Sequence, residues 1–451
     1  MQQLSFIHVS DLHLDNFPPV KQENDEMAIR LHDAPYEALK NLLELCRQKS
    51  PQFIVYSGDI HEHGLLSLEA RFCLTDFFNE LKTLDIPFYY ACGNHDHLGQ
   101  NDSFFQNFEN VFRFSENWSH FPYPPSKSED TENEADRCAP LCSIYGVSHS
   151  TRKELKNFLK DFSCNAAAPF NIGVLHATVG SSDKIKNTDK HVVALCREKD
   201  FNSFPIDYWA LGHIHEPAVI QESPFLAYAG AMQATRMSET GARGATLVTA
   251  EHFENKTEQK IHTEFFPLAP LETYSLSLAL AMDEELENTG QCLEYFLYAF
   301  KKEYAKFEKN PLCRTRIFNL YLEGQHDFYE ELQEEGFIQN LKSKLEEIET
   351  DTKIFIKKIK CLIRPRFGYE NAHKRDDLLG EVFRLLETLR QDPETFENII
   401  RKLDNDFKIK NEIELGFFAH GDKRSKKQLE KYRKTLLKAC ENICVNVLEP
   451  K

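Results

Sequence analysis

The sequence predicts an α/β protein with a large first domain, a small second α/β domain and a helical C-terminal tail. Over the first 265 residues, short apolar runs alternate with amphipathic segments, as in sheets whose strands are joined by helices. Five of these runs end in Asp, Asn or His, and open α/β sheets gather their ligands at such strand ends. A Pro267-Leu268-Ala269-Pro270 linker then precedes a new pattern. We therefore expect domains at residues 1–266, 271–365 and 366–451.

Composition is typical of a soluble globular protein of several domains. The 451 residues exceed one usual domain, and 41% are hydrophobic while 28% are charged. No apolar run approaches the roughly 20 residues that cross a bilayer, and the start enters a strand without a signal-peptide pattern. The twelve cysteines are scattered through apolar segments, which favours reduced thiols. We expect a cytoplasmic protein with no membrane partner.

The charge is unevenly distributed. A net charge of -17 argues against nucleic acid, because Lys and Arg drive binding to phosphates. Residues 352–451, however, carry 23 Lys and Arg against 16 Asp and Glu, whereas the rest of the chain carries 31 against 55. Metal ions bound by carboxylates would offset the acidic charge locally, so a phosphodiester substrate is not excluded.

Two strand-helix units open the chain. Each begins with an apolar run of strand length and continues in a segment with apolar residues at helical spacing. The predicted strands are residues 4–9 and 53–56, and the predicted helices are residues 36–49 and 66–84. The first strand leads to Asp11 and His13, and the second leads to Asp59.

The third strand, residues 86–90, runs into Ala91-Cys92-Gly93-Asn94-His95-Asp96. Gly has no Cβ to block close approach, so an amide, an imidazole and a carboxylate follow one another at a strand tip. Alone, the last four residues are as consistent with a polar turn as with a metal site. The recurrence of the pattern at other strand ends decides in favour of the metal site.

The remainder of the first domain repeats this plan. Residues 115–139 are rich in Pro and acidic residues and predict an exposed insertion loop. Beyond them we expect strands at residues 141–146, 171–175, 208–211, 225–228 and 246–248, and a helix at residues 153–162. The strand at 171–175 leads to His176, and the strand at 208–211 leads to Gly212-His213-Ile214-His215.

The second domain is predicted to be a β-α-β-α-β unit followed by helices. Its strands are expected at residues 274–280, 316–323 and 353–363, with helices ending near 307 and spanning 328–348. The tail contains a basic cluster, namely Lys423, Arg424, Lys426 and Lys427, in an amphipathic segment. A solvated helix packed on its own domain and a helix that binds the DNA backbone or an ATPase explain this cluster equally well.

Seven of the strand-end residues form a candidate ligand set for two metal ions. Each alone has an ordinary structural explanation, but together they supply carboxylate, imidazole and amide donors without thiolates, which suits Mn²⁺, Fe or Zn²⁺. We expect Asp59 to bridge two ions about 3.5–4 Å apart. The others divide into Asp11, His13 and His215 on one ion, and Asn94, His176 and His213 on the other.

His95 is left over in this division. It is placed to protonate a leaving alkoxide or to stabilise its charge, and Asp96 is the candidate to orient it through a ring nitrogen.

The motifs 11–13, 58–59, 93–96, His176 and 212–215, in this order, resemble those of the calcineurin-like metallophosphoesterases. Within that family, residues 10–15, 207–215 and 228–233, followed by Glu239, resemble the bacterial SbcD and YhaO group of DNA repair exonucleases. The resemblance covers most of residues 1–265 and implies an αββα sandwich with a capping domain. It further implies two divalent ions, with Mn²⁺ favoured, DNA as substrate, an SMC-type, SbcC-like ATPase as candidate partner, and a homodimer as candidate assembly.

We therefore expect a metal-dependent phosphodiesterase, an exonuclease or endonuclease of double-strand-break repair or end processing. Two alternatives stay open, a phosphoesterase for small nucleotides or phosphoproteins and a non-catalytic scaffold for an SMC-type ATPase. Some relatives have a second functional His shortly after the bridging Asp. Here Glu62 stands between His61 and His63. Either histidine is a candidate for that role, and the alternative that we favour is that both are exposed loop residues.

Overall fold

The structure is a computed structural model that describes residues 3–16, 26–62, 64–125, 140–164, 168–180, 192–253, 259–280, 286–365, 380, 381 and 384. The chain forms two units, of which the first comprises residues 1–323 and 330–362 and the second residues 324–329 and 363–451. The predicted helical tail lies outside the described residues except for residues 380, 381 and 384. The tail's four basic candidates, Lys423, Arg424, Lys426 and Lys427, lie outside them as well.

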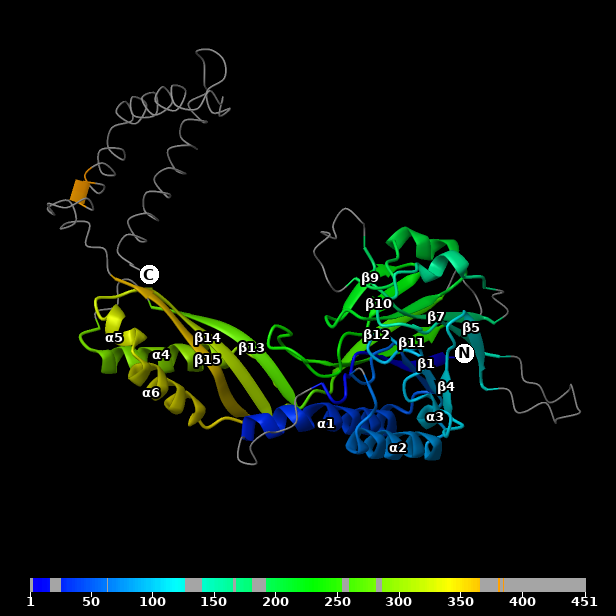
Figure 1. Ribbon diagram of the computed structural model, residues 1–451, viewed down its shortest axis with the longest axis horizontal. Coiled ribbons are helices and arrows are strands. Elements are labelled where there is room, and N and C mark those ends of the chain that lie inside the picture. Colours follow the sequence, from blue (N-terminus) through cyan, green and yellow to red (C-terminus); the bar gives the residue numbers. More distant parts are fainter. Residues whose placement is uncertain are drawn as a thin grey trace, which may run out of the picture. The chain divides into compact units, whose positions relative to one another are not determined.

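Two six-stranded sheets confirm the predicted α/β class (Figure 1). The first has the order β12 (Lys260–Pro267), β11 (Gly244–Glu251), β1 (Gln3–Val9), β2 (Phe53–Tyr56), β3 (Phe88–Tyr90) and β4 (Val111–Arg113). The second has the order β5 (Ser119–Tyr123), β6 (Cys142–Gly146), β7 (Phe170–His176), β8 (Tyr208–Gly212), β10 (Phe225–Tyr228) and β9 (Ala218–Glu222). The central strands β1, β2 and β3 are parallel, as are β6, β7, β8 and β10.

The two large sheets pack face to face, because successive side chains of each strand point to opposite faces of its sheet. On β1, Phe6 belongs to the core between the sheets, whereas its neighbour Ile7 belongs to the core on the opposite face. The inner core joins side chains such as Phe53 to Ile172 and Ala210 of the second sheet. The outer face of the first sheet is covered by α1 (Glu26–Lys49), α2 (Leu68–Thr83) and the short α3 (Asp102–Phe105).

The outer face of the second sheet is covered by 3₁₀ helices, not by the α-helix that the sequence predicted. Instead of a helix at residues 153–162, the chain forms a 3₁₀ helix, η2 (Phe158–Asp161), and a second one follows at η3 (Glu198–Ser203). The adjacent residues Phe158 and Leu159 are both buried against this sheet. Two neighbouring anchors do not make the apolar stripe that a longer α-helix needs.

Four strands were missed because they lie at sheet edges. β4 precedes the predicted insertion loop, and β5 lies inside it, so the loop prediction was wrong at residues 119–123. β9 and β12 are antiparallel additions at the ends of the two sheets. The side chains of these four strands are mostly half-buried or exposed, so the sequence carries only a weak apolar alternation there. Residues 126–139 of the predicted loop lie outside the described residues.

A third, three-stranded sheet has the predicted β-α-β-α-β order. It consists of β13 (Leu271–Ala279), β14 (Thr315–Gln325) and β15 (Lys353–Arg364), with α4 (Thr289–Tyr304) after the first strand. The helix predicted at 328–348 is divided into α5 (Tyr329–Gln333) and α6 (Glu335–Glu346), because Glu334 has an extended backbone with ψ 141°. α4 and α6 lie on one side of this sheet, and Phe300 of α4 packs edge-on against Phe318 of β14 (Figure 1).

A buried histidine between the two large sheets should make stability depend on pH. His8 Nδ1 lies 3.0 Å from the Tyr208 hydroxyl and its Nε2 lies 3.0 Å from Ser57 Oγ. Burial lowers the pKa of His8 from 6.5 to about 3. Between these values the unfolded chain binds a proton that the folded chain does not, so stability is lost as pH falls, by about 1.4 kcal/mol per pH unit.

We expect His8→Gln to lower the free energy of unfolding at pH 7. On acidification, however, the variant should lose less of its free energy of unfolding than the parental protein does. Between pH 6.5 and pH 5 the loss should be smaller than in the parental protein by about 2 kcal/mol, since the titrating group is gone. Denaturant unfolding at both pH values measures this difference. His262→Gln, at an exposed position of β12, is the control and should leave the pH dependence unchanged. Identical pH slopes for His8→Gln and the parental protein would contradict the buried neutral His8.

Candidate metal centre

The seven predicted ligands follow the carboxyl ends of five parallel strands. β1 leads to Asp11 and His13, and β2 leads to Asp59. The remaining ligands are Asn94 after β3, His176 at the end of β7, and His213 and His215 after β8. Since the two sheets pack face to face, these strand ends meet at one edge of the sandwich.

The backbone is strained where it presents several of these side chains. Asp11 has φ 53°, His13 has φ 51°, Asp59 has φ 59° and His213 has φ 95°. Non-glycine residues rarely adopt positive φ, and such strain persists only where the surrounding structure enforces it. Four strained residues in one cluster are typical of a functional site.

Two glycines allow the strand ends to approach each other closely. A Cβ on Gly58 would lie 2.3 Å from Nδ1 of His176, and a Cβ on Gly93 would lie 2.3 Å from Oδ1 of Asp59. Gly58 also has φ 102°, which side-chain-bearing residues rarely adopt. These glycines let a histidine from the second sheet reach the carboxylate from the first.

The first predicted ligand group is present as a cluster. One ligand atom from each of Asp11, His13 and His215 lies within 4.8 Å of the others. Nε2 of His13 lies 3.2 Å from Nε2 of His215, and Oδ1 of Asp11 lies 3.8 Å from the former and 3.6 Å from the latter. Two imidazole nitrogens and a carboxylate oxygen therefore face one common space.

The second group contains Asp59, His176 and Asn94. Nε2 of His176 lies 3.2 Å from Oδ2 of Asp59 and 3.0 Å from Oδ1 of Asn94. Asp59 also lies 3.7 Å from Nε2 of His13, so its carboxylate stands between the two groups, as the bridging role requires. His213 places its ring beside that of His176, with centroids 5.3 Å apart, and donates its backbone N–H to Asp11.

Outer oxygen acceptors fix the direction of three imidazoles. Nδ1 of His13 lies 3.0 Å from Glu62, Nδ1 of His215 lies 2.8 Å from Glu239, and Nδ1 of His176 lies 2.8 Å from the Ser57 carbonyl. An acceptor at Nδ1 keeps the proton there and turns the Nε2 lone pair toward the centre. Because all three Nε2 atoms converge beside carboxylates and no thiolate is present among these ligands, the residues fit divalent ions of the Mn²⁺, Fe or Zn²⁺ type.

The charges of the site reinforce one another. Burial alone would raise the pKa of Asp59, but the surrounding imidazoles, chiefly His176, hold it well below its usual range. Burial lowers the pKa of His176, but Asp59 outweighs it and raises the value to about 9. Burial alone would raise the pKa of Glu239, but the hydrogen bond and charge of His215 outweigh it and lower the pKa to about 2. In the metal-free chain the raised pKa of His176 therefore favours a proton that metal binding at this imidazole must release.

His95 lies beside the predicted bridge, but its partner differs from the prediction. Its backbone N–H donates to Asp59 Oδ1 over 2.8 Å, and its Nδ1 contacts Oε1 of Glu62. The proposed orienting residue Asp96 is buried and instead accepts hydrogen bonds from the Ile60 and Gly93 N–H groups and from the Tyr90 hydroxyl. Asp96 therefore shapes the loops, and the carboxylate that orients His95 is Glu62.

Sequence reasoning missed the functions of Glu62 and Glu239. Glu239 stands within a stretch that carries the family resemblance, which was the available signal. Glu62 follows the bridging Asp59 by three residues, but no local pattern indicated that it would reach two histidines. The interpretation of His61 as exposed was wrong, because it is buried and its Nε2 lies 3.2 Å from the Asn101 amide. His63 lies outside the described residues.

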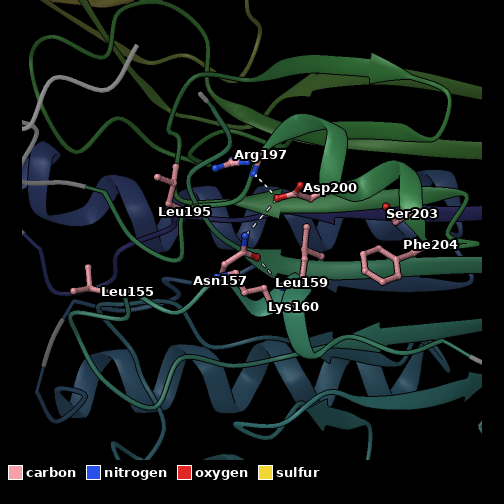
Figure 2. A pocket seen from close by; sticks show the side chains of 9 residues that line it. All are labelled: Leu155, Asn157, Leu159, Lys160, Leu195, Arg197, Asp200, Ser203 and Phe204. Carbon is pink, nitrogen blue, oxygen red and sulfur yellow. Dashed lines mark hydrogen bonds between the residues drawn. The ribbon is translucent and has the colours of Figure 1, made fainter. Parts of the chain in front are cut away.

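A separate cavity of about 580 Å³ lies over the second sheet's outer face (Figure 2). It is lined by Leu155, Asn157, Leu159, Lys160, Leu195, Arg197, Asp200, Ser203 and Phe204. Figure 2 shows Asp200 between Arg197 and Asn157, and it accepts hydrogen bonds from the backbone N–H of the first and the amide of the second. None of the predicted ligands lines this cavity, so it is distinct from the metal centre.

Comparison with known proteins agrees with this geometry. Residues 4–217 match the family described as "Calcineurin-like phosphoesterase". The "Uncharacterized metallophosphoesterase YhaO" of Bacillus subtilis is 30% identical over 292 residues, which cover 64% of this chain and 68% of that protein.

Two solved structures are also similar. A dimetal phosphatase from Danio rerio has a TM-score of 0.32 and 12% identity, covering 58% of this chain and 96% of that one. The protein TT1561 of Thermus thermophilus has a TM-score of 0.32 and 10% identity, covering 58% of this chain and 99% of that one.

None of the described helices has the length and apolar character needed to cross a membrane. From the matched residues and the relative's identity and coverage, the chain belongs to the calcineurin-like phosphoesterase family.

Proposed function

We propose that this phosphoesterase is a two-metal phosphodiesterase that cleaves DNA, a nuclease of double-strand-break repair or end processing. The observation that carries the proposal is the position of Asp59 between two groups of convergent ligand atoms, with His95 next to it. When bound, two ions held by these groups would supply a clamp for the attacking and leaving oxygens of a phosphoryl centre and would activate water as the nucleophile. Among the reactions that these ligands could support, such a centre is best suited to phosphoryl transfer.

The chain's own residues prepare the reaction in two ways. Glu62 contacts Nδ1 of both His13 and His95, so one carboxylate sets the orientation of a metal ligand and of the candidate acid. The His95 ring lies 4.9 Å from the His13 ring and is 23% exposed, so a substrate can reach it. Burial lowers the pKa of His95, but Glu62 and Asp59 outweigh it and raise the pKa, which favours a protonated imidazole that can donate to the leaving oxygen.

The choice of DNA rests on the resemblance of residues 10–15, 207–215 and 228–233 to DNA repair exonucleases and on the positive charge of residues 352–451. Positive charge favours phosphate backbones, whereas a small diester does not need it. We further propose Mn²⁺ as the physiological metal, an SMC-type ATPase as partner and a homodimer as the assembly. The complete ligand set argues against a non-catalytic scaffold.

The substrate is tested by offering end-labelled duplex DNA and a chromogenic small diester in parallel with Mn²⁺. The proposal expects shortened or cut DNA at concentrations well below those needed for comparable turnover of the small diester. Efficient hydrolysis of the small diester with intact DNA would favour the nucleotide or phosphoprotein alternative. If neither the DNA nor the small diester is hydrolysed, the result would favour the non-catalytic scaffold.

DNA binding should depend on the basic cluster of the tail. Replacing Lys423, Arg424, Lys426 and Lys427 with Gln should weaken DNA binding and flatten its salt dependence, because each lost phosphate contact changes the logarithmic salt slope by roughly 0.9. Hydrolysis of the small diester should be unchanged. Fluorescence anisotropy with labelled duplex at several salt concentrations measures both quantities. An unchanged affinity and slope would assign the cluster to packing or to a protein partner.

A further inference from the structure

His215 is held at two points by one loop. We call residues 233–243, the part of the β10–β11 connection that directly precedes β11, the brace loop. Oε1 of Glu239 lies 2.8 Å from Nδ1 of His215, and Nη1 of Arg243 donates to the His215 carbonyl over 2.7 Å. Arg243 is only 1% exposed, so this bond is shielded from water. Both the ring and the backbone of this candidate ligand therefore depend on the brace loop.

The same loop is fastened to the first strand of the three-stranded sheet. The Thr273 hydroxyl donates to the Glu239 carbonyl over 3.0 Å, and the Gly241 N–H donates to the Thr273 carbonyl over 3.1 Å. The Gln233 side chain donates to the Leu271 carbonyl over 2.9 Å. Gln233 and Thr273 are buried, so β13 holds the loop at both of its ends through shielded bonds.

The brace loop is also rigid internally. Oε2 of Glu239 accepts the Thr235 N–H over 2.7 Å, and Nη2 of Arg243 donates to the Thr240 carbonyl over 3.0 Å. Both oxygens of Glu239 accept hydrogen bonds from Thr235 of the loop, and Oε1 also contacts His215, so the position of this carboxylate is coupled to that of the loop. A displacement of β13 is therefore transmitted to His215.

In the other ligand group, His176 and Asn94 are positioned by elements of the two large sheets. His176 is oriented by the Ser57 carbonyl, and its neighbour Asn94 follows β3. Both elements belong to the two large sheets. His215 and His176 are thus held by different parts of the chain.

We propose that Thr273 and Glu239 are positioning residues through which the β13–β14–β15 sheet completes the metal site of Asp11, His13 and His215. The proposal rests on the two-ion centre proposed above. It implies that a partner bound to the three-stranded sheet can tune this metal site, because the brace loop fastens its ligand His215 to β13.

The test is a Mn²⁺ titration of the full chain, with free Mn²⁺ followed by electron paramagnetic resonance. Thr273→Val removes the hydroxyl at nearly constant volume and should lower the affinity for one of the two Mn²⁺ ions by about 3–10-fold. Glu239→Ala should lower the affinity for the same ion by about 10–100-fold. Thr273→Ser keeps the hydroxyl and should bind as the parental protein does. Glu239→Gln keeps one acceptor and should fall between Glu239→Ala and the parental protein.

Thr315→Val is the matched control. Thr315 is a buried threonine on the neighbouring strand β14, and its hydroxyl accepts from Arg30 of α1 instead of contacting the brace loop. It should leave both metal affinities unchanged. Denaturant unfolding of each metal-free variant shows whether a change in affinity merely follows a change in folding.

The outcomes separate this proposal from the proposed function. Selective weakening of one ion by Thr273→Val, with Thr273→Ser and Thr315→Val unaffected, supports the brace. Two ions bound equally well by Thr273→Val and the parental protein would overturn the brace and leave the two-ion centre standing. Equal weakening of both ions, or the same effect in Thr315→Val, would also overturn it. A parental protein that binds fewer than two ions would contradict the two-ion centre itself.

Discussion

Replacing Asp59 with Asn should reduce phosphodiester hydrolysis by about 10³-fold or more and lower the metal content at the same time. Asp59 is almost fully buried, and its Oδ2 lies 3.7 Å from Nε2 of His13 and 3.2 Å from Nε2 of His176. The substitution removes one negative charge that both ions would share, and a bound ion contributes several kcal/mol to the stabilisation of the transition state. Because Asn can still accept the His95 N–H, the loop geometry should survive.

Mass spectrometry of metal content, together with diester hydrolysis, measures both effects. Asp76→Asn is the matched control, since it removes a carboxylate from an exposed position of α2 and should alter neither quantity. Two ions at full occupancy in the Asp59→Asn protein would refute the bridge. Retained metal with lost activity would instead give Asp59 a role in the reaction that metal binding does not explain.

Replacing His95 with Ala should lower DNA cleavage by about 10²–10⁴-fold, the usual contribution of a positioned general acid. Metal content and DNA affinity should stay nearly unchanged, because the predicted division places no ion on this ring. The loss should be smaller for a chromogenic diester, whose acidic leaving group departs with little help. Initial rates on both substrates, measured with the same protein preparation, test this difference.

His97→Ala provides the comparison for the His95 variant. His97 lies two residues further along, and its ring contacts the Leu98 carbonyl and the Gln100 amide instead of the ligands. It should cut DNA at the parental rate. Cleavage by His95→Ala at the parental rate would reduce that imidazole to a supporting role. Equal losses on DNA and the chromogenic diester would point to metal positioning instead of proton donation.

The centre of the fold and the ligand set were predictable because both leave strong local signals. Buried parallel strands such as β2 and β7 are largely apolar runs, and each leads to a possible metal ligand, a pattern that recurs along the chain. The carboxyl ends of parallel strands must meet at a sheet edge, so Asp59 and His176 could be assigned to one site although they are far apart in sequence. The structure places their side chains 3.2 Å apart.

The supporting residues could not be predicted in the same way, because their roles depend on tertiary distances. Asp96 follows His95 directly, yet its carboxylate turns to the backbone of residues 60 and 93. Glu62, from a different loop, takes the place beside the ring. The half-exposed edge strands and the 3₁₀ helix η2 were missed for a related reason, since each is defined by its neighbours more than by its own periodicity.

The most direct test of the two-ion centre is a crystal structure of the protein grown with Mn²⁺, with the metals located by anomalous diffraction. The proposal predicts two peaks about 3.5–4 Å apart. The Asp59 carboxylate should lie between them, with Asp11, His13 and His215 around one peak and Asn94, His176 and His213 around the other. A single peak, or two peaks with Asp59 bound to neither, would contradict the account.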